Sequence, residues 1–133
     1  MFDFEKLDVY SVVKEQNQKV LQFLKDHPEL DPEIASELKK ASMAVVSNLA
    51  EGTGKMNDTE KKQYLSDART SVFRSVAMLD ILRSIGQLDE EDFLQLYEGF
   101  EKSSKMLLGM YRSYSSNRSG NNNSHTNSGS QTV

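Results

Sequence analysis

Apolar residues recur at helical spacing along four segments of the chain, and short polar stretches separate the segments. The clearest segment repeats its apolar positions in heptad steps, at Ile34, Leu38, Ala41, Val45 and Leu49. Asp31 can cap the start of this helix, and Pro32 suits its first turn. Gly52 and Gly54 then mark its end. The pattern therefore predicts a helix that begins at residue 32 and stops near residue 52.

A helix is predicted on either side of this segment. Over residues 7–25 the apolar stripe consists of Val9, Val13, Val20 and Leu24. Gln16 and Asn17 interrupt that stripe in its middle turn. The next helix begins after Asn57, which can form an approximate capping box with Glu60, and it ends at Gly86. Its apolar positions are Leu65, Ala68, Val72, Val76, Leu79 and Leu82.

The fourth predicted helix follows Asp89, which can cap it. This helix presents Phe93, Tyr97, Phe100, Leu107 and Tyr111 at helical spacing. Short connections make consecutive helices antiparallel neighbours, so we predict an all-α, up-down-up-down four-helix bundle over residues 1–114. Residues 115–133 are rich in Ser, Asn and Gly without periodicity, and we predict a disordered tail there.

Composition narrows the function classes. The formal net charge is −4 and the pI is about 5.2, which disfavours a protein that binds nucleic acid over its whole surface. The 133-residue chain contains no cysteine, so disulfides and thiolate metal sites are excluded. Its first residues lack the basic start and apolar run of a secretory signal, and no apolar stretch reaches the length of a membrane span. We therefore expect a cytoplasmic protein.

No set of residues in the sequence indicates catalysis. The histidines, His27 and His125, are far apart and neither follows a glutamate by three residues, so neither a metal pair nor a di-iron bundle is indicated. The run Gly52, Thr53, Gly54, Lys55 resembles part of a phosphate-binding loop, but the flanking positions and the preceding helix do not fit one. We expect no enzymatic activity, no metal and no cofactor.

Two polar features are candidate sites. Asn48, Glu51 and Arg69 can meet across the second and third helices, where we predict a structural cluster that fixes their register, with ligand binding as the alternative. A local basic face is also predicted around the end of the second helix and the start of the third. Its candidate nucleic-acid contacts are Lys39, Lys40, Lys55, Lys61 and Lys62.

The last two helices carry more apolar residues than one core requires. The surplus positions are Phe73, Met78, Ile81, Leu94, Leu96, Met106, Leu108 and Met110. Apolar residues on two faces of a helix in a small bundle indicate a second buried surface. We therefore expect contacts between copies of the chain.

Three stretches of the sequence match the signature residues of one family of four-helix bundles. The stretch from Asn48 to Gly52 matches the signature Asn-Ile-Ala-Glu-Gly, with leucine in place of isoleucine. The other matching residues are Leu7, Val9, Tyr10, Tyr64, Leu65, Ala68, Arg69 and Ser71. In these stretches the chain resembles the 23S rRNA intervening-sequence proteins and the accessory variability proteins of diversity-generating retroelements. The chain departs from the family pattern at Thr70, where glycine is usual, and at Arg74, where glutamate is frequent.

The resemblance carries two implications. It implies an up-down bundle that assembles into a ring-shaped homopentamer. The retroelement relatives also imply an alternative function, an accessory protein that binds RNA or a reverse transcriptase. A non-enzymatic, oligomeric interaction scaffold is the first expectation, because the acidic balance of this chain weakens the second.

Overall fold

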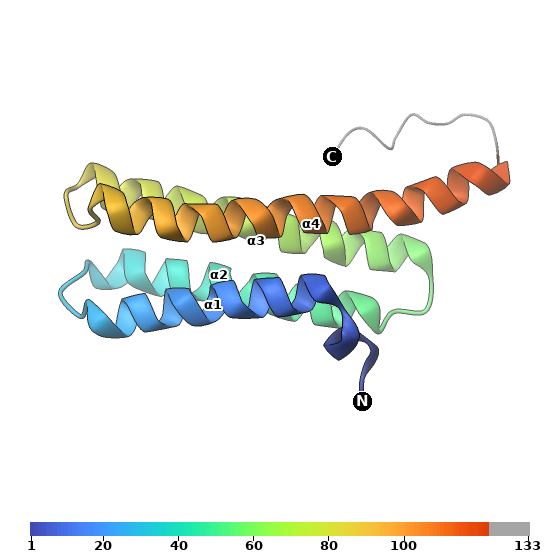
Figure 1. Cartoon of the computed structure of the whole chain (residues 1–133), viewed down its shortest axis with the longest axis horizontal. Helices are drawn as coiled ribbons and strands as arrows, with labels where there is room; N and C mark the ends of the chain where they lie inside the picture. Colours follow the sequence, from blue (N-terminus) through green and yellow to red (C-terminus); the bar gives the residue numbers. More distant parts are fainter. Residues whose placement is uncertain (123–133) are drawn as a thin grey trace.

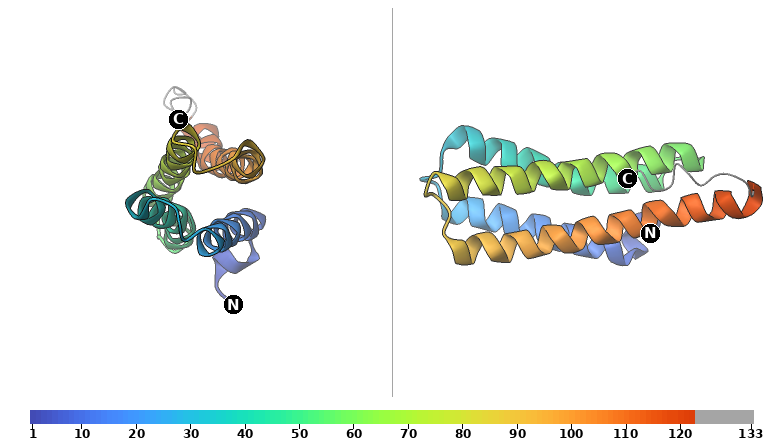
Figure 2. Two further views of the ribbon diagram at one scale, coloured as in Figure 1. Left: turned by 90° about the vertical axis from the view of Figure 1, so that its left-hand side faces the viewer. Right: turned by 90° about the horizontal axis from the view of Figure 1, so that it is seen from above.

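The computed structural model describes residues 1–122, and side chains as far as residue 114, as a bundle of four long α-helices. After the short 3-10 helix η1 (Asp3–Lys6) come α1 (Asp8–Asp26), α2 (Pro32–Thr53), α3 (Asp58–Ser84) and α4 (Glu90–Asn122). Figure 1 shows α1 and α2 in one layer and α3 and α4 in the other. In the end-on view of Figure 2 the four helices occupy the corners of a square, so α1 neighbours both α2 and α4. The predicted up-down-up-down arrangement is confirmed.

The helix starts lie where capping side chains stand in the sequence. The Asp31 carboxylate accepts hydrogen bonds from the backbone N–H groups of Glu33 and Ile34, both at 3.0 Å. Asn57 caps α3 by accepting from the Glu60 N–H at 2.9 Å. These side chains satisfy donors that have no partner inside their own helix, so they fix where α2 and α3 begin.

The turn between α3 and α4 is built in the same way. Gly86 has a φ of +80°, a left-handed conformation that favours glycine. The Gln87 N–H donates to the Leu82 carbonyl at 2.9 Å, which closes the C-terminus of α3 in a Schellman motif. Asp89 then caps α4 by accepting from the Asp92 N–H at 2.8 Å. Both predicted helix boundaries are confirmed.

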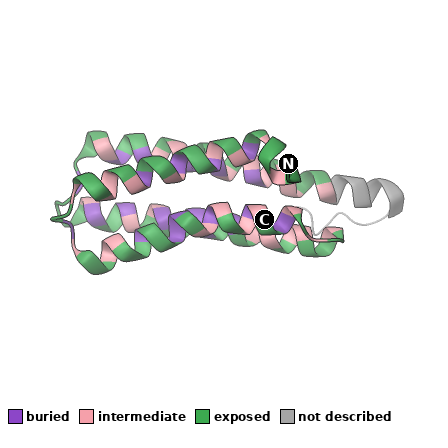
Figure 3. Cartoon of the chain, turned by 90° about the horizontal axis from the view of Figure 1, so that it is seen from below, coloured by how far each residue is buried: buried purple, intermediate pink, exposed green. Residues whose placement is uncertain are grey.

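The apolar stripes of the four helices meet in one core. Figure 3 shows the buried residues along the helices, interleaved with exposed ones. The largest fully buried side chains come from α2, α3 and α4, namely Leu38, Leu49, Leu79, Leu82, Phe100 and Leu107. One expectation needs correction here, because Leu96, assigned to a surplus face, lies in the core. Gln16, which interrupts the stripe of α1, is buried as well.

The last helix is longer than the sequence pattern indicated. α4 continues to Asn122, so the predicted tail over residues 115–133 begins inside it. Residues 123–133 lie outside the described part of the chain, and the domain boundary at residue 114 stays a prediction. Within the described residues, no helix combines the length and apolar character needed to cross a membrane.

Candidate interaction site

A groove of about 610 Å³ lies between α3 and α4 on the outside of the bundle, and we call it the α3–α4 groove. Its lining is mainly apolar and includes Val72, Val76, Phe93, Tyr97 and Phe100. Val72 and Phe100 also belong to the core, so the groove opens directly onto it. Because the two helices are long and packed against each other, the lining is built on rigid elements.

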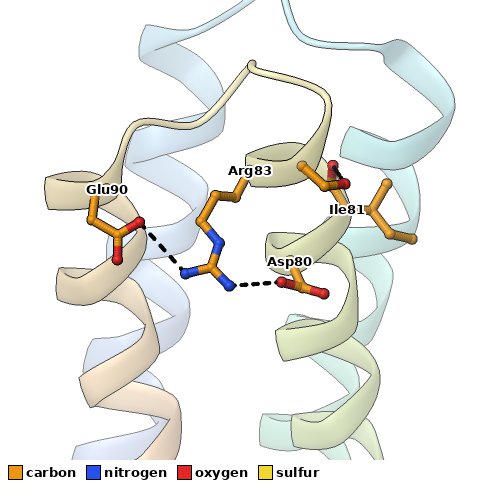
Figure 4. Close-up of polar contacts among 5 residues, drawn as sticks. Asp80, Ile81, Arg83 and Glu90 are labelled. Atoms are coloured by element: carbon orange, nitrogen blue, oxygen red, sulfur yellow. Dashed lines mark hydrogen bonds and ion pairs between the residues drawn. The ribbon is translucent and has the colours of Figure 1, made fainter.

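Large apolar side chains are exposed in and next to this groove. Phe73 lines the groove and is 52% exposed, and Leu94, which follows the lining residue Phe93 on α4, is 46% exposed. Ile81 and Ile85 are exposed as well, but they do not line the groove, and Figure 4 shows Ile81 directed away from α4. Large apolar residues exposed at a groove often mark a surface that a partner covers.

Two arginines cross the groove and hold its walls together. The Arg69 Nε donates to the Ser104 hydroxyl at 3.1 Å and lies close to the Ser104 carbonyl at 3.4 Å, which ties α3 to α4. The same guanidinium lies 4.9 Å from the centre of the Phe73 ring. Arg83 lies over the Phe93 ring at 3.7 Å. These cation–aromatic contacts shield part of the apolar lining while they keep the groove in shape.

The charges of the groove are not evenly distributed. Arg83 extends from α3 toward α4 and pairs with Asp80 at 2.8 Å and Glu90 at 3.5 Å, as Figure 4 shows. This end, near the α3–α4 turn, therefore holds two carboxylates around one guanidinium. In the other half of the groove, Arg69 and Lys105 contribute positive charge and Glu101 contributes one negative charge. One half of the groove therefore has an excess of negative charge and the other half has an excess of positive charge.

The predicted polar cluster draws its residues from α2 and α3. Asn48 is half-buried on α2, Glu51 is exposed on the same helix, and Arg69 is half-buried on α3. The described hydrogen bonds of Arg69 run to Ser104 on α4, away from the α2 side on which the prediction relies. A cluster of these three residues that sets the register of α2 and α3 stays a prediction.

The glycine beside this cluster has a clear structural role. A Cβ added to Gly52 would lie 2.7 Å from the Tyr64 Cβ, closer than side-chain atoms approach one another. Gly52 therefore lets α2 and α3 come close together. The signature residue Gly52 thus lies directly against Tyr64 of α3.

The candidate lysines fall into two groups. Lys39 and Lys40 are exposed in the first half of α2, roughly 20 Å along the helix from its C-terminus. Lys61 donates from Nζ to the Thr53 carbonyl at 3.1 Å and so caps α2. Lys55 and Lys62 lie over the rings of Tyr64 and Tyr111, at 5.1 Å and 4.8 Å. The lysines near the α2–α3 connection are therefore engaged within the bundle.

The described residues that were considered for catalysis make contacts that belong to helix ends and turns. His27 lies 2.9 Å from the Phe23 carbonyl through Nδ1, and its ring stacks on the Phe23 ring at 4.2 Å. Gly54 forms the C-cap of α2. Among residues 1–122, no three or more His, Cys, Asp or Glu side chains lie together as a metal site. His125 lies outside the described residues.

Two features of α4, the groove that it forms with α3 and the buried Gln16 that it packs against, were not predicted from the sequence. The sequence pattern indicated Phe73 and Leu94 as surplus apolar residues but did not locate a groove between α3 and α4. In that pattern Gln16 and Asn17 were only an interruption of a stripe. The signal available was the position of Gln16, four residues from Val20 and three from Val13, which places it on the buried face of α1.

Comparison with known proteins gives a family and a fold. The model of the 23S rRNA-intervening sequence protein family matches residues 5–109. Among solved structures, the chain is similar to a protein of unknown function from the S23 ribosomal protein family of Bacteroides thetaiotaomicron. The TM-score is 0.72 at 12% identity, over 77% of this chain and 97% of that one. No curated protein sequence matches the chain.

Proposed function

The chain belongs to the 23S rRNA-intervening sequence protein family, and we propose that it is a non-enzymatic interaction scaffold that assembles from several copies through the α3–α4 groove. The observation that carries this proposal is the apolar α3–α4 groove, with the exposed Phe73 in its lining and the exposed Leu94 next to the lining residue Phe93. Burying these side chains against another molecule removes apolar area from water and so favours association.

The charge order of the groove supports a second copy of the chain as the occupant. Asp80 and Glu90 surround Arg83 at one end. Arg69 and Lys105 lie with Glu101 toward the other, so the two ends have opposite net charges. When a second copy lies antiparallel on this surface, the acidic end of each groove faces the basic end of the other. The surface is therefore complementary in charge to itself. Pairing of this surface with itself gives an even number of copies, whereas the ring of five implied by the family resemblance needs a second, different surface.

Sedimentation equilibrium of the full chain tests the proposal and counts the copies. We expect a mass that is a multiple of 15.1 kDa at micromolar concentration. Phe73→Asp places a charge in the apolar groove and should shift the protein toward the monomer. Gln18→Asp adds the same charge on the exposed side of α1 and should leave the mass unchanged. A wild-type mass of one chain, with native helicity, would contradict the proposal.

The alternative, an accessory protein that binds RNA or a reverse transcriptase, relies on the five lysines. RNA affinity that falls steeply with added salt, and that is lost when Lys39 and Lys40 are replaced by glutamine, would favour it. These two lysines are exposed and fully available, whereas Lys55, Lys61 and Lys62 already make contacts within the bundle. Absence of RNA binding at low salt would remove this alternative.

A further inference from the structure

The buried polar side chains of the described residues gather at one height of the bundle. Each of the four helices contributes to them, and they are Gln16, Ser42, Ser71, Ser75 and Ser103. Two hydrogen bonds that involve residues of α1 establish the height. Gln16 Nε2 donates to the Leu96 carbonyl of α4 at 2.8 Å, and the Ser42 hydroxyl of α2 donates to Asn17 Oδ1 at 2.7 Å.

The serines of α3 and α4 belong to the same height. The bond from Arg69 to Ser104 fixes the antiparallel alignment of these two helices. Counted from that bond, Ser71 and Ser75 are level with the stretch of α4 around Gly99 and Ser103. Ser75 and Ser103 donate to carbonyls of their own helices, Ser71 at 2.9 Å and Gly99 at 2.8 Å. We call these residues, together with Asn17, the polar layer.

Gln16 enters the layer through a gap that only glycine provides. A Cβ added to Gly99 would lie 1.7 Å from Gln16 Oε1 and 2.4 Å from its Cδ. These distances lie far inside atomic contact, so no other residue at position 99 is compatible with the observed place of Gln16. By contrast, a Cβ added to Gly109 on the same helix would meet nothing within 4 Å.

A glutamine at position 16 does not maximise the stability of the fold. Gln16 is only 3% exposed, and within the described residues its Oε1 has no hydrogen-bond partner. Exchanging the amide oxygen and nitrogen would bring two oxygens together at the Leu96 carbonyl, so the orientation is set. A buried acceptor without a donor opposes folding, and an apolar side chain of similar size would avoid that cost.

The apolar residues of α1 leave its position along the bundle poorly defined. A slide of α1 by one helical turn brings Val20 to the place of Gln16, Leu24 to the place of Val20 and Asn17 to the place of Val13. The exchange of valine and leucine changes the core volume by one methylene group, so the polar residues of α1 distinguish the two alignments more strongly than its apolar residues do. Gln16 distinguishes them strongly, because a slide takes its amide away from both the Leu96 carbonyl and Gly99.

We propose that Gln16 and Gly99 form a peg and slot that fixes the register of α1 against α4. Asn17 and Ser42 fix α1 against α2 in the same layer. α1 is held in this way whether or not copies of the chain associate. Because the layer lies behind residues 97–105 of α4, it also positions the wall of the α3–α4 groove.

A double-mutant cycle in the full chain tests the peg and slot. Gly99→Ala should lower the thermal midpoint by about 5–10 °C, whereas Gly109→Ala should leave it unchanged or raise it. Gln16→Ala shortens the peg, so the further loss on adding Gly99→Ala should largely vanish in that background. If Gly99→Ala alone does not fold, recovery of folding in the double variant supports the proposal. Equal effects at both glycines, or a double variant no better than Gly99→Ala, would overturn it.

A second variant separates register from packing. Gln16→Met keeps the length of the side chain and removes the amide, so the thermal midpoint should change by no more than a few degrees. The amide NMR spectrum should then show two sets of α1 resonances in slow or intermediate exchange, because both alignments become populated. A single sharp set, with the wild-type pattern of contacts between α1 and α4, would overturn the proposed role of Gln16.

Discussion

The two sides of α4 are both unusual, because one buries polar side chains and the other exposes apolar ones. On its inner side, toward α1, the core holds the Gln16 amide and the Ser103 hydroxyl. On its outer side, toward α3, apolar side chains line an open groove at the same height. Polar groups are thus buried and apolar groups exposed within one stretch of one helix. Places where a sequence departs from simple patterning are places where another requirement dominates.

The two sides serve contacts with different requirements: the inner contact must select one alignment of α1, and the outer contact must supply free energy for association. Inside, a buried amide distinguishes the correct alignment of α1 from a shifted one, which apolar packing does weakly. Outside, apolar area provides free energy for association, which polar groups in water supply poorly. We infer that the inner side serves pairing within the chain and the outer side serves pairing between chains.

The largest changes in unfolding free energy are expected inside the bundle, and the first is at the contact between α2 and α3. Gly52→Ala should destabilise the fold by about 2–3 kcal/mol, because its Cβ would collide with Tyr64. Gly109→Ala is the matched control and should be neutral or stabilising by up to about 1 kcal/mol. Urea unfolding measures both. If the two variants have equal stability, close approach of α2 and α3 does not depend on Gly52.

Two residues of α3 sharpen the contrast between inside and outside. Leu79 is fully buried and does not line the groove, whereas Phe73 lines the groove and is half-exposed. Leu79→Ala should cost about 3 kcal/mol of unfolding free energy and change the association constant little. Phe73→Ala should cost less than about 1 kcal/mol and weaken association clearly. Urea unfolding and sedimentation of both variants check this crossed pattern, and the same ranking in both measurements would erase the distinction.

A capping residue away from both sides should have a smaller effect. Asp31→Ala removes two hydrogen bonds at the start of α2 and should cost about 1 kcal/mol. Asp31→Asn keeps an acceptor and should retain most of the stability. Thermal unfolding compares the two variants. Equal losses would show that the carboxylate charge, rather than the cap, is what matters there.

The smallest effect is expected for the ion pair at the acidic end of the groove. Asp80→Asn removes the Asp80–Arg83 pair of Figure 4, in which the Asp80 side chain is about two-thirds exposed to solvent and the Arg83 side chain about one-third. Its cost in unfolding free energy should stay below about 1 kcal/mol. Association should weaken more than stability, and the difference should shrink at high salt. A stability loss of several kcal/mol would mean that the pair supports the fold itself.

The helices, caps and topology could be predicted because each depends on local sequence. Asp31, Asn57, Asp89 and Gly86 act within one turn of their own positions, and the apolar stripes repeat with the helical period. The family resemblance pointed to Gly52, although its close contact with Tyr64 appeared only in three dimensions.

The register device and the groove depend on contacts that sequence spacing does not give. Gln16 meets Leu96 and Gly99 from eighty or more positions away, so nothing near it in the sequence marks its partner. Leu96 and Phe73 both looked like surplus apolar residues. The packing of the four helices in three dimensions, and not the period of either helix, decides that Leu96 of α4 is buried and Phe73 of α3 is exposed.

The central claim is that another copy covers the outer side of α4 and α3. The chain has no cysteine, so Ala77→Cys places a single thiol at an exposed position in the groove. Its rate of reaction with a maleimide should fall as protein concentration rises through the range of association, while the rate at Gln18→Cys on α1 stays constant. Equal and constant rates at both positions, in a protein that has assembled, would show that the groove remains open and would contradict the account.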